Sequence, residues 1–325
     1  MGVLRAVRST LSAIVQPFGY EIVATKTQRE TDDSPRPLKF SYINPIVMEA
    51  ELRAGRGDFN GMLTSLQQLS LADFAWLLLA PPPKFPALTS MLPRMASKDV
   101  QLLWTGAHGA TLLIQSLLFA KSIETSFSRF TGRQLHGATI LDFGCGWGRL
   151  LRLMLWFSHP DKIYGVDPWD KSLQICAEDG VLGSRAKSDW IPNALPFEGV
   201  QFDLVYAFSV FTHLSERTMM AAQRAIRQRI KPDGLLVITI RPVEYWDVDP
   251  ISADPEKHSA VLARHRARGF AFVPHDREPV DGDVTYGDTS MTFDYIRENW
   301  ASWQLCGYDH NVQDSHQITV FLTPN

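Results

Sequence analysis

The chain has 325 residues and a mass of 36.6 kDa, so we expect either one large domain or a domain with a substantial extension. Hydrophobic residues make up 45% and charged residues 21%, a composition that excludes a largely disordered chain and a polytopic membrane protein. The net charge of −3 provides no basic surface for nucleic acid. The three cysteines lie far apart, which fits neither a disulfide framework nor a structural zinc site and suits a reducing cytoplasm.

The first thirty residues predict an amphipathic helix, residues 4–15, followed by a short extended piece. The apolar run in this helix is too short and too interrupted for a signal peptide. A helix docked on the protein is the favoured interpretation, and peripheral contact with the inner face of a membrane through Arg5 and Arg8 is the alternative. The longest uncharged stretch, residues 100–120, carries many polar groups, so we predict a buried soluble helix from about residue 110 and no membrane span.

Prolines and glycines divide the rest of the chain into elements. Residues 40–104 are helical in pattern but broken, and the helix at 70–80 must stop at Pro81. After residue 110, short apolar runs alternate with helical periodicity, which is typical of a parallel sheet with helices on both faces. The predicted strands are 139–143, 162–167, 202–207 and 234–240, and the helices between them are 149–157, 170–180 and 215–230.

Two further expectations concern the ends of these elements. We expect Asp170 to cap the helix that Gly180 closes. Two late strands, 303–305 and 317–322, are expected to join through a turn around Gly307 and to form an antiparallel pair at one edge of the sheet.

The most informative segment is Leu141-Asp-Phe-Gly-Cys-Gly-Trp-Gly-Arg149, in which a strand leads through three glycines into a helix. Glycines let the backbone approach a ligand, and the helix start offers free N–H groups, so the segment predicts a nucleotide-type cofactor site. A dinucleotide fingerprint would need glycine at position 149, which is arginine. Asp142 would lie badly beside a pyrophosphate but suits an ammonium group, as in S-adenosylmethionine. Asp167, which ends the second strand, is placed to accept hydrogen bonds from ribose hydroxyls.

These segments resemble the class I S-adenosylmethionine-dependent methyltransferases. The resemblance covers about residues 110–324 and is carried, in the family's order, by 141–149, 165–168, 188–190, 202–214 and 231–235. It implies a doubly wound, Rossmann-like α/β fold with a seven-stranded sheet and an antiparallel edge pair. It also implies S-adenosyl-L-methionine as the methyl donor and S-adenosyl-L-homocysteine as the product.

The resemblance further assigns cofactor contacts along the carboxyl edge of the sheet. The residues expected to bind the methionyl part, ribose, adenine and sulfonium region are Asp142, Gly144, Cys145, Gly146, Gly148, Asp167, Pro168, Asp189, Trp190 and Phe208. Asp189 also fits an exposed turn, where aspartates are common. Trp147 fits packing as well as contact.

The candidate catalytic residue is His213, in the segment Phe208-Ser-Val-Phe-Thr-His-Leu214 that follows the third clear strand. A neutral imidazole can take the proton of a hydroxyl acceptor, whereas the plainer interpretation is a histidine that holds the loop or orients the substrate. The proline-rich insertion 241–291 predicts a substrate lid, and its candidate acceptor contacts are Glu244, Tyr245, Tyr286 and Asp288. The histidines at 258, 265 and 275 lack metal-ligand spacing, so no metal is predicted.

We therefore expect a helical N-terminal extension, residues 1–105, that caps the substrate opening, forms a homodimer surface or docks on the rest of the protein. A methyltransferase domain, residues 106–325, should follow it. The expected function is methylation of a small molecule or glycan in the cytoplasm, by O-methylation with His213 as base. Residues 18–22 and 307–317 are similar to bacterial methyltransferases linked to cell-surface polysaccharide. The alternatives are N-methylation of an amino sugar or other small amine, a non-catalytic S-adenosylmethionine-binding partner protein, and an NAD-dependent oxidoreductase.

Overall fold

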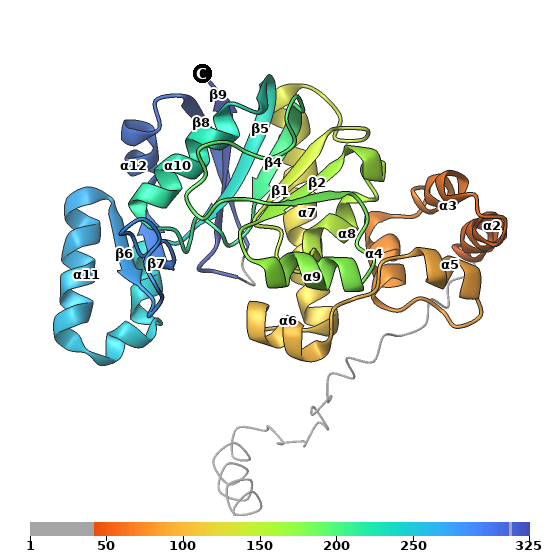
Figure 1. Cartoon of the computed structure of the whole chain (residues 1–325), viewed down its shortest axis with the longest axis horizontal. Helices are drawn as coiled ribbons and strands as arrows, with labels where there is room; N and C mark the ends of the chain where they lie inside the picture. Colours follow the sequence, from red (N-terminus) through yellow and green to blue (C-terminus); the bar gives the residue numbers. More distant parts are fainter. Residues whose placement is uncertain (1–41, 312–313) are drawn as a thin grey trace, which may run out of the picture. The chain divides into compact units, whose positions relative to one another are not determined.

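A computed structural model describes residues 42–311 and 314–325, all of which belong to one compact unit of the chain, residues 36–325. The helix predicted at residues 4–15 lies outside the described residues. Within the described residues, five helices precede the long helix that leads into the sheet (Figure 1). They are α2 (Asn44–Gly55), α3 (Phe59–Leu66), α4 (Leu71–Leu79), α5 (Pro86–Met91) and α6 (Lys98–Thr105). The predicted helix at 70–80 is confirmed as α4, which Ser70 caps by accepting a hydrogen bond from the backbone N–H of Asp73.

The long helix α7 (Gly109–Thr131) leads into the sheet. Among the described residues no single helix has the length and hydropathy to cross a membrane; α6 and α7 reach that composition only as a pair, and they are bent by 53°.

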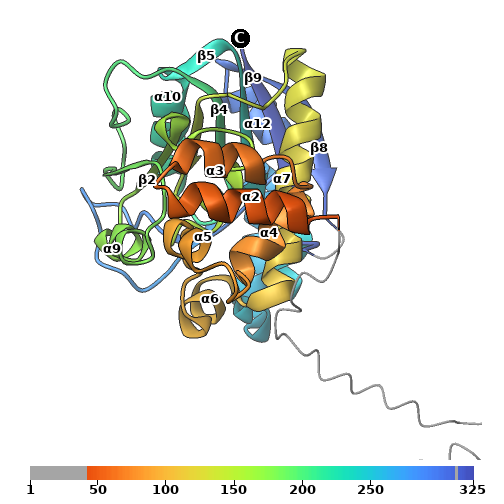
Figure 2. The ribbon, with the colours of Figure 1, turned by 90° about the vertical axis from the view of Figure 1, so that its right-hand side faces the viewer.

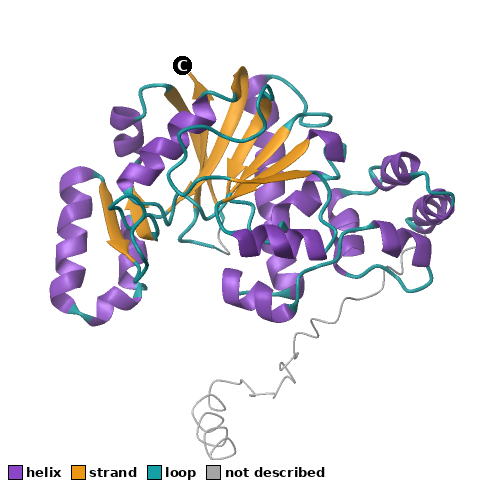
Figure 3. Ribbon diagram, viewed as in Figure 1, coloured by secondary structure: helices purple, strands orange, loops and turns teal. Residues whose placement is uncertain are grey.

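A seven-stranded sheet forms the centre of the described unit, in the order β3-β2-β1-β4-β5-β9-β8 (Figure 3). Strands β1 to β5 pair in parallel, while β9 is antiparallel to both β5 and β8. The strands are β1 (Ile140–Phe143), β2 (Ile163–Asp167), β3 (Ser184–Lys187), β4 (Phe202–Ala207), β5 (Ile230–Ile240), β8 (Trp303–His310) and β9 (Ile318–Pro324). The predicted doubly wound, Rossmann-like fold with an antiparallel edge pair is confirmed.

Successive side chains of a strand point to opposite faces of the sheet, and hydrophobic clusters cover both faces. On one face, Ile140 of β1 packs in a hydrophobic cluster that includes α4, α7 and α8 (Arg149–Met154). On the other face, Leu141 packs in a cluster with α10 (Glu216–Arg227) and α12 (Phe293–Asn299). The short helices η2 (Pro160–Lys162) and α9 (Asp170–Glu178) complete the crossovers around β2.

The helices before the sheet share its core. Buried side chains of α2 to α5 belong to the same cluster as Ile140 and Leu150, and α4 contacts both α7 and α8. Figure 2 views the molecule from the side on which these helices lie. Residues 42–105 therefore extend the core of the sheet, and the domain boundary at residue 105 stays a prediction.

The insertion between β5 and α12 has structure of its own. It contains η3 (Val243–Asp247), η4 (Pro250–Ala253), α11 (Pro255–Arg268) and a separate antiparallel pair, β6 (Phe270–Pro274) with β7 (Gly287–Met291). Gly269 ends α11 with the left-handed φ of +66° that favours glycine. The β6–β7 pair was not predicted.

Two expectations about element ends are wrong. Trp169, and not Asp170, is the N-cap of α9, and the Asp170 carboxylate instead forms an ion pair with Lys187 at 2.7 Å. Gly307 lies within β8, at an irregularity in its pairing with β9. A Cβ there would lie 2.9 Å from Cζ of Phe130, so this glycine permits close packing of α7 against the edge strand and makes no turn.

Candidate cofactor and acceptor site

The glycine loop after β1 is held in a conformation that its glycines require. Gly144, Gly146 and Gly148 have φ angles of +78°, +52° and +77°. A Cβ on Gly148 would lie 3.0 Å from Val181 Cγ2 and 3.1 Å from Cys176 Sγ, so the loop also packs tightly there. The chain thus turns at once from β1 into α8 at the carboxyl edge of the sheet, where this fold places its ligands.

Asp167 connects the end of β2 to this loop. One carboxylate oxygen accepts a hydrogen bond from the backbone N–H of Gly146 at 2.9 Å, and the other accepts one from Trp169 at 2.9 Å. Burial raises the pKa of Asp167, and the two backbone N–H groups act against that rise. Each oxygen keeps a further lone pair that a hydroxyl of a ligand can use.

Asp142 lies deeper, with only 3% of its surface exposed. Burial raises the pKa of Asp142 well above its ordinary value, while the nearby Tyr206 hydroxyl and Arg149 guanidinium act in the opposite direction.

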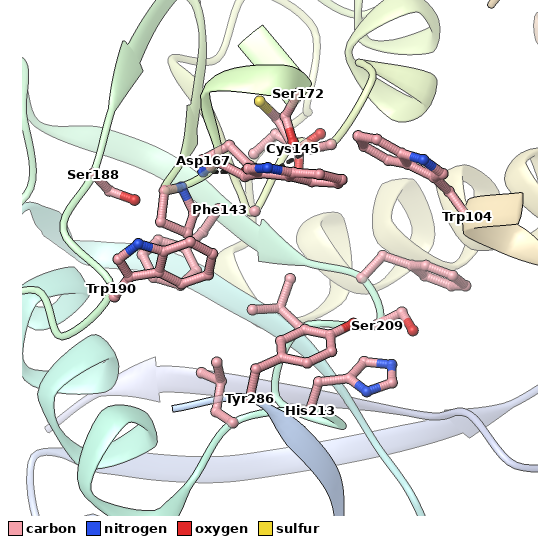
Figure 4. Close-up of a pocket in the computed structure, with 18 of the residues that line it drawn as sticks. Trp104, Phe143, Cys145, Asp167, Ser172, Ser188, Trp190, Ser209, His213 and Tyr286 are labelled. Carbon is pink, nitrogen blue, oxygen red and sulfur yellow. Dashed lines mark hydrogen bonds between the residues drawn. The ribbon is translucent and has the colours of Figure 1, made fainter. Parts of the chain in front are cut away.

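A cavity of about 450 Å³ opens over the loop and collects most of the predicted cofactor residues (Figure 4). Those that line it are Asp142, Gly144, Cys145, Gly146, Asp167, Pro168, Asp189, Trp190 and Phe208. Gly148 packs near Val181 and Cys176 and does not line the cavity. In the described part of the chain, no three His, Cys, Asp or Glu side chains come together as metal ligands would.

One wall of the cavity comes from α6, which the sequence did not predict to contact the glycine loop. Leu103, Trp104 and Thr105 line the cavity, and Trp104 stacks on Trp169 with ring centroids 4.8 Å apart and planes 20° apart. Figure 4 shows Trp104 and Trp190 on opposite sides of the cavity, with Tyr286 and His213 below them. No sequence pattern joins α6 to residues sixty positions later, so only the tertiary structure reveals this wall.

His213 lines the cavity from the loop that follows β4. Its ring stacks on Tyr286 with centroids 4.9 Å apart, and its Nδ1 lies 2.7 Å from the Gly287 carbonyl. Because a carbonyl only accepts, Nδ1 carries the proton, and the lone pair on Nε2 faces Nη2 of Arg241 at 3.2 Å. Burial, followed by the Arg241 charge, lowers the pKa of His213 to about 4. The imidazole is therefore neutral at neutral pH, and both of its nitrogens have protein partners.

The other predicted acceptor residues divide into two groups. Tyr286 lines the cavity. Asp288 lies behind His213, where it pairs with Arg241 and accepts hydrogen bonds from Tyr245 Oη at 3.0 Å and His275 Nε2 at 2.6 Å. Burial acts to raise the pKa of Asp288, but His275 and Arg241 outweigh it and lower that pKa. Glu244, Tyr245 and Asp288 are outside the cavity lining.

Comparison with known protein families gives one match. Residues 140–234 match the family model described as a methyltransferase domain. No curated protein matches the chain.

Several solved structures have a similar fold. A S-adenosylmethionine-dependent methyltransferase from Clostridium acetobutylicum ATCC 824 is 11% identical, with a TM-score of 0.43 over 69% of this chain and 95% of that one. DesVI from Streptomyces venezuelae is 14% identical, with a TM-score of 0.45 over 71% of this chain and 100% of that one. Magnesium protoporphyrin IX methyltransferase (ChlM) from Synechocystis PCC 6803, with bound SAH, is 13% identical, with a TM-score of 0.43 over 66% and 86%.

Proposed function

Because residues 140–234 match the family model of a methyltransferase domain, we propose that this protein is a class I S-adenosylmethionine-dependent methyltransferase that acts on a small-molecule or glycan acceptor. When bound, S-adenosylmethionine supplies an activated methyl group. The observation that carries the proposal is the cavity at the carboxyl edge of the sheet, where the Asp167 carboxylate, the glycine loop and several aromatic faces meet. The protein then has to hold the two reactants in line and keep water out.

The residues around the cavity fit this cofactor better than a dinucleotide. Asp167 offers lone pairs to ribose hydroxyls, and Pro168 and Trp190 offer apolar surface to an adenine ring. Asp142 and Asp189 add further carboxylates to the lining. Arg149 and Arg277 also line the cavity, so the lining offers acceptors and donors of both signs, which suits a ligand that carries an ammonium and hydroxyl groups and no phosphate.

We further propose that His213 positions the acceptor and does not take its proton. Its Nε2 lone pair faces the Arg241 guanidinium, and a pKa near 4 makes the imidazole a weak base. This favours N-methylation of an amino sugar or other small amine, since a neutral amine attacks with its own lone pair. O-methylation with His213 as base is the second candidate, because His213 lines the cavity and is neutral at neutral pH.

Calorimetry and product analysis test the proposal. The wild type should bind S-adenosylmethionine and S-adenosylhomocysteine and should not bind NAD. Asp167→Asn should weaken binding of S-adenosylhomocysteine by about tenfold or more, since hydrogen bonds to charged groups contribute about 1.5–3 kcal/mol. Asp294→Asn, which changes an exposed carboxylate paired only with Arg297 in the same helix, should not. Binding of NAD alone, or full affinity in the Asp167 variant, would contradict the assignment.

Incubation with S-adenosylmethionine carrying a labelled methyl group and a metabolite extract should then give a methylated product. Mass spectrometry and NMR of that product distinguish nitrogen from oxygen as the methylated atom. Tight cofactor binding without any methylated product would instead support a non-catalytic binding partner.

A further inference from the structure

Arg277 brings to the cavity a positive charge that no carboxylate of the protein pairs with. It lies in the loop of residues 275–286, which joins β6 to β7 in the insertion. In the part of the chain that the structure describes, no carboxylate oxygen lies within 4.0 Å of its guanidinium, and no protein group accepts a hydrogen bond from it. Asp276 and Glu278 flank it in the sequence and do not pair with it either. The N–H groups of Arg277 are therefore available to a ligand.

Two other arginines at the site use their donors within the protein. Arg149 donates a hydrogen bond to Oε1 of Gln115 at 2.8 Å. Arg241 forms an ion pair with the Asp288 carboxylate behind His213. These two side chains have structural partners, whereas the described structure leaves Arg277 without one.

The Arg277 side chain is nevertheless held in place. Its guanidinium carbon lies 4.2 Å from the centroid of the Tyr286 ring, and a cation is attracted to the face of an aromatic ring. The same ring stacks on His213 with centroids 4.9 Å apart (Figure 4). The ends of the loop are fixed as well, because the backbone N–H of His275 donates to the Tyr286 carbonyl at 3.2 Å and that of Gly287 donates to the His213 carbonyl at 2.9 Å. The guanidinium is thus oriented before any ligand binds.

The position of Arg277 points to the acceptor. The residues predicted to contact the cofactor come from the glycine loop, the segments after β2 and β3, and Phe208, whereas Arg277 belongs to the insertion that contributes Tyr286. Arg277 and His213 both contact the Tyr286 ring, so one small molecule can reach both side chains.

The chemistry of a guanidinium then specifies the kind of acceptor. Its planar fork of N–H groups matches two oxygens of a carboxylate or a phosphate. We propose that the acceptor carries such an anionic group, which Arg277 binds while the atom to be methylated lies beside His213. This inference rests on the proposed function and narrows its substrate class to small molecules or glycan units with a carboxylate or a phosphate. It makes Arg277 a residue that determines acceptor specificity.

Titration of the complex with S-adenosylhomocysteine by inorganic phosphate and by acetate, at low ionic strength, tests the site directly. The wild-type complex should bind at least one of these anions in calorimetry. Arg277→Gln should weaken that binding by about tenfold or more, the range expected for hydrogen bonds to a charged group. Arg277→Lys keeps the charge without the fork and should lie between the two. Arg297→Gln, which changes an exposed arginine paired with Asp294 in α12, is the control and should bind the anion as the wild type does.

The affinity for S-adenosylhomocysteine separates this role from a role in cofactor binding. In Arg277→Gln it should stay within about twofold of the wild type. A loss of cofactor affinity that matches the loss of anion affinity would overturn the proposal. No anion binding by the wild type, or equal anion binding by the wild type and Arg277→Gln, would overturn it too. A wild type that does not bind S-adenosylhomocysteine would instead overturn the proposed function, and the anion titration of the unliganded protein would still decide on Arg277.

The methylated product from the metabolite extract distinguishes the two sources of the anion. Phosphorus NMR should detect a phosphate in that product, or carbon NMR should detect a carboxylate. Arg277→Gln should raise KM for the same acceptor by about tenfold or more and leave kcat nearly unchanged, because the anionic group binds equally in the ground state and the transition state. A product with neither group, or a variant that lowers kcat and leaves KM unchanged, would contradict the proposal.

Discussion

Replacing His213 by glutamine should make the stability of the protein less sensitive to acid. In the folded protein, burial and the Arg241 charge lower the pKa of His213 from 6.5 to about 4. In the unfolded chain the imidazole regains its ordinary pKa of about 6.5. As the pH falls, the unfolded chain therefore takes up the proton first. The stability linked to His213 is fully present above about pH 6.5 and is lost as the pH falls toward 4.

The size of this effect follows from the two pKa values. The shift corresponds to about 3 kcal/mol once the pH is below both values. At about pH 5, where the folded protein still keeps the imidazole neutral, the loss is about 2 kcal/mol relative to about pH 7.5. Glutamine does not titrate, so the free energy of unfolding of His213→Gln should fall by about 2 kcal/mol less than that of the wild type between these conditions. The side chain is only 15% exposed, so solvent screening does not remove the effect.

Urea unfolding of both proteins at the two pH values measures the difference directly. His136→Gln, which removes an exposed histidine, is the control for the loss of one imidazole. The same pH dependence in wild type and His213→Gln would refute the buried, neutral state of His213. It would also mean that the pKa of His213 in the folded protein is close to the ordinary value for histidine, so that His213 could act as a base. The pH dependence of wild-type activity provides a second test. Any loss of activity in acid that results from protonation of His213 should have its midpoint near pH 4 and not near 6.5.

Two other substitutions test the glycine loop and the α6 wall. Gly148→Ala places a Cβ at a φ of +77° and 3.0 Å from Val181 Cγ2, so urea unfolding should show a loss of about 2–3 kcal/mol. Gly180→Ala, at a φ of +64° with nothing within 4 Å, should lose only about 1–2 kcal/mol, and equal losses would show that crowding at Gly148 is unimportant. Trp104→Ala removes the stack on Trp169 and part of the cavity wall, so calorimetry should show S-adenosylhomocysteine binding weakened by roughly 2- to 10-fold. An unchanged affinity would mean that α6 does not cover the bound ligand.

The elements that were predicted correctly are those whose structure follows from the residue pattern within the element itself. Strand β4 is buried at every position, and all of its residues except Asp203 are hydrophobic, a pattern typical of a strand that is buried on both faces. The proximity of the glycine loop and Asp167 could also be predicted, because they lie at the ends of adjacent strands that pair in parallel, while their role in binding a cofactor stays a prediction.

The features that were missed depend on contacts between distant segments. Gly307 was predicted as a turn because glycine is common in turns, but it is required by the ring of Phe130 in α7. The state of His213 depends on Arg241, which directly follows β5, and on Gly287, which begins β7 in the insertion. Trp104 reaches the cavity only because α6 packs beside the glycine loop, and nothing in its own neighbourhood in the sequence indicates that contact.

The stacked pair of Trp104 and Trp169 also gives the protein an optical property. Two indole rings 4.8 Å apart couple their electronic transitions, so this pair should contribute an exciton signal to the near-ultraviolet circular dichroism of the nine tryptophans. Because both rings line the cavity, a ligand that shifts either ring changes that coupling. Ligand binding in the cavity can therefore be followed by circular dichroism of the unlabelled protein, through the pair of rings that lies between α6 and the glycine loop.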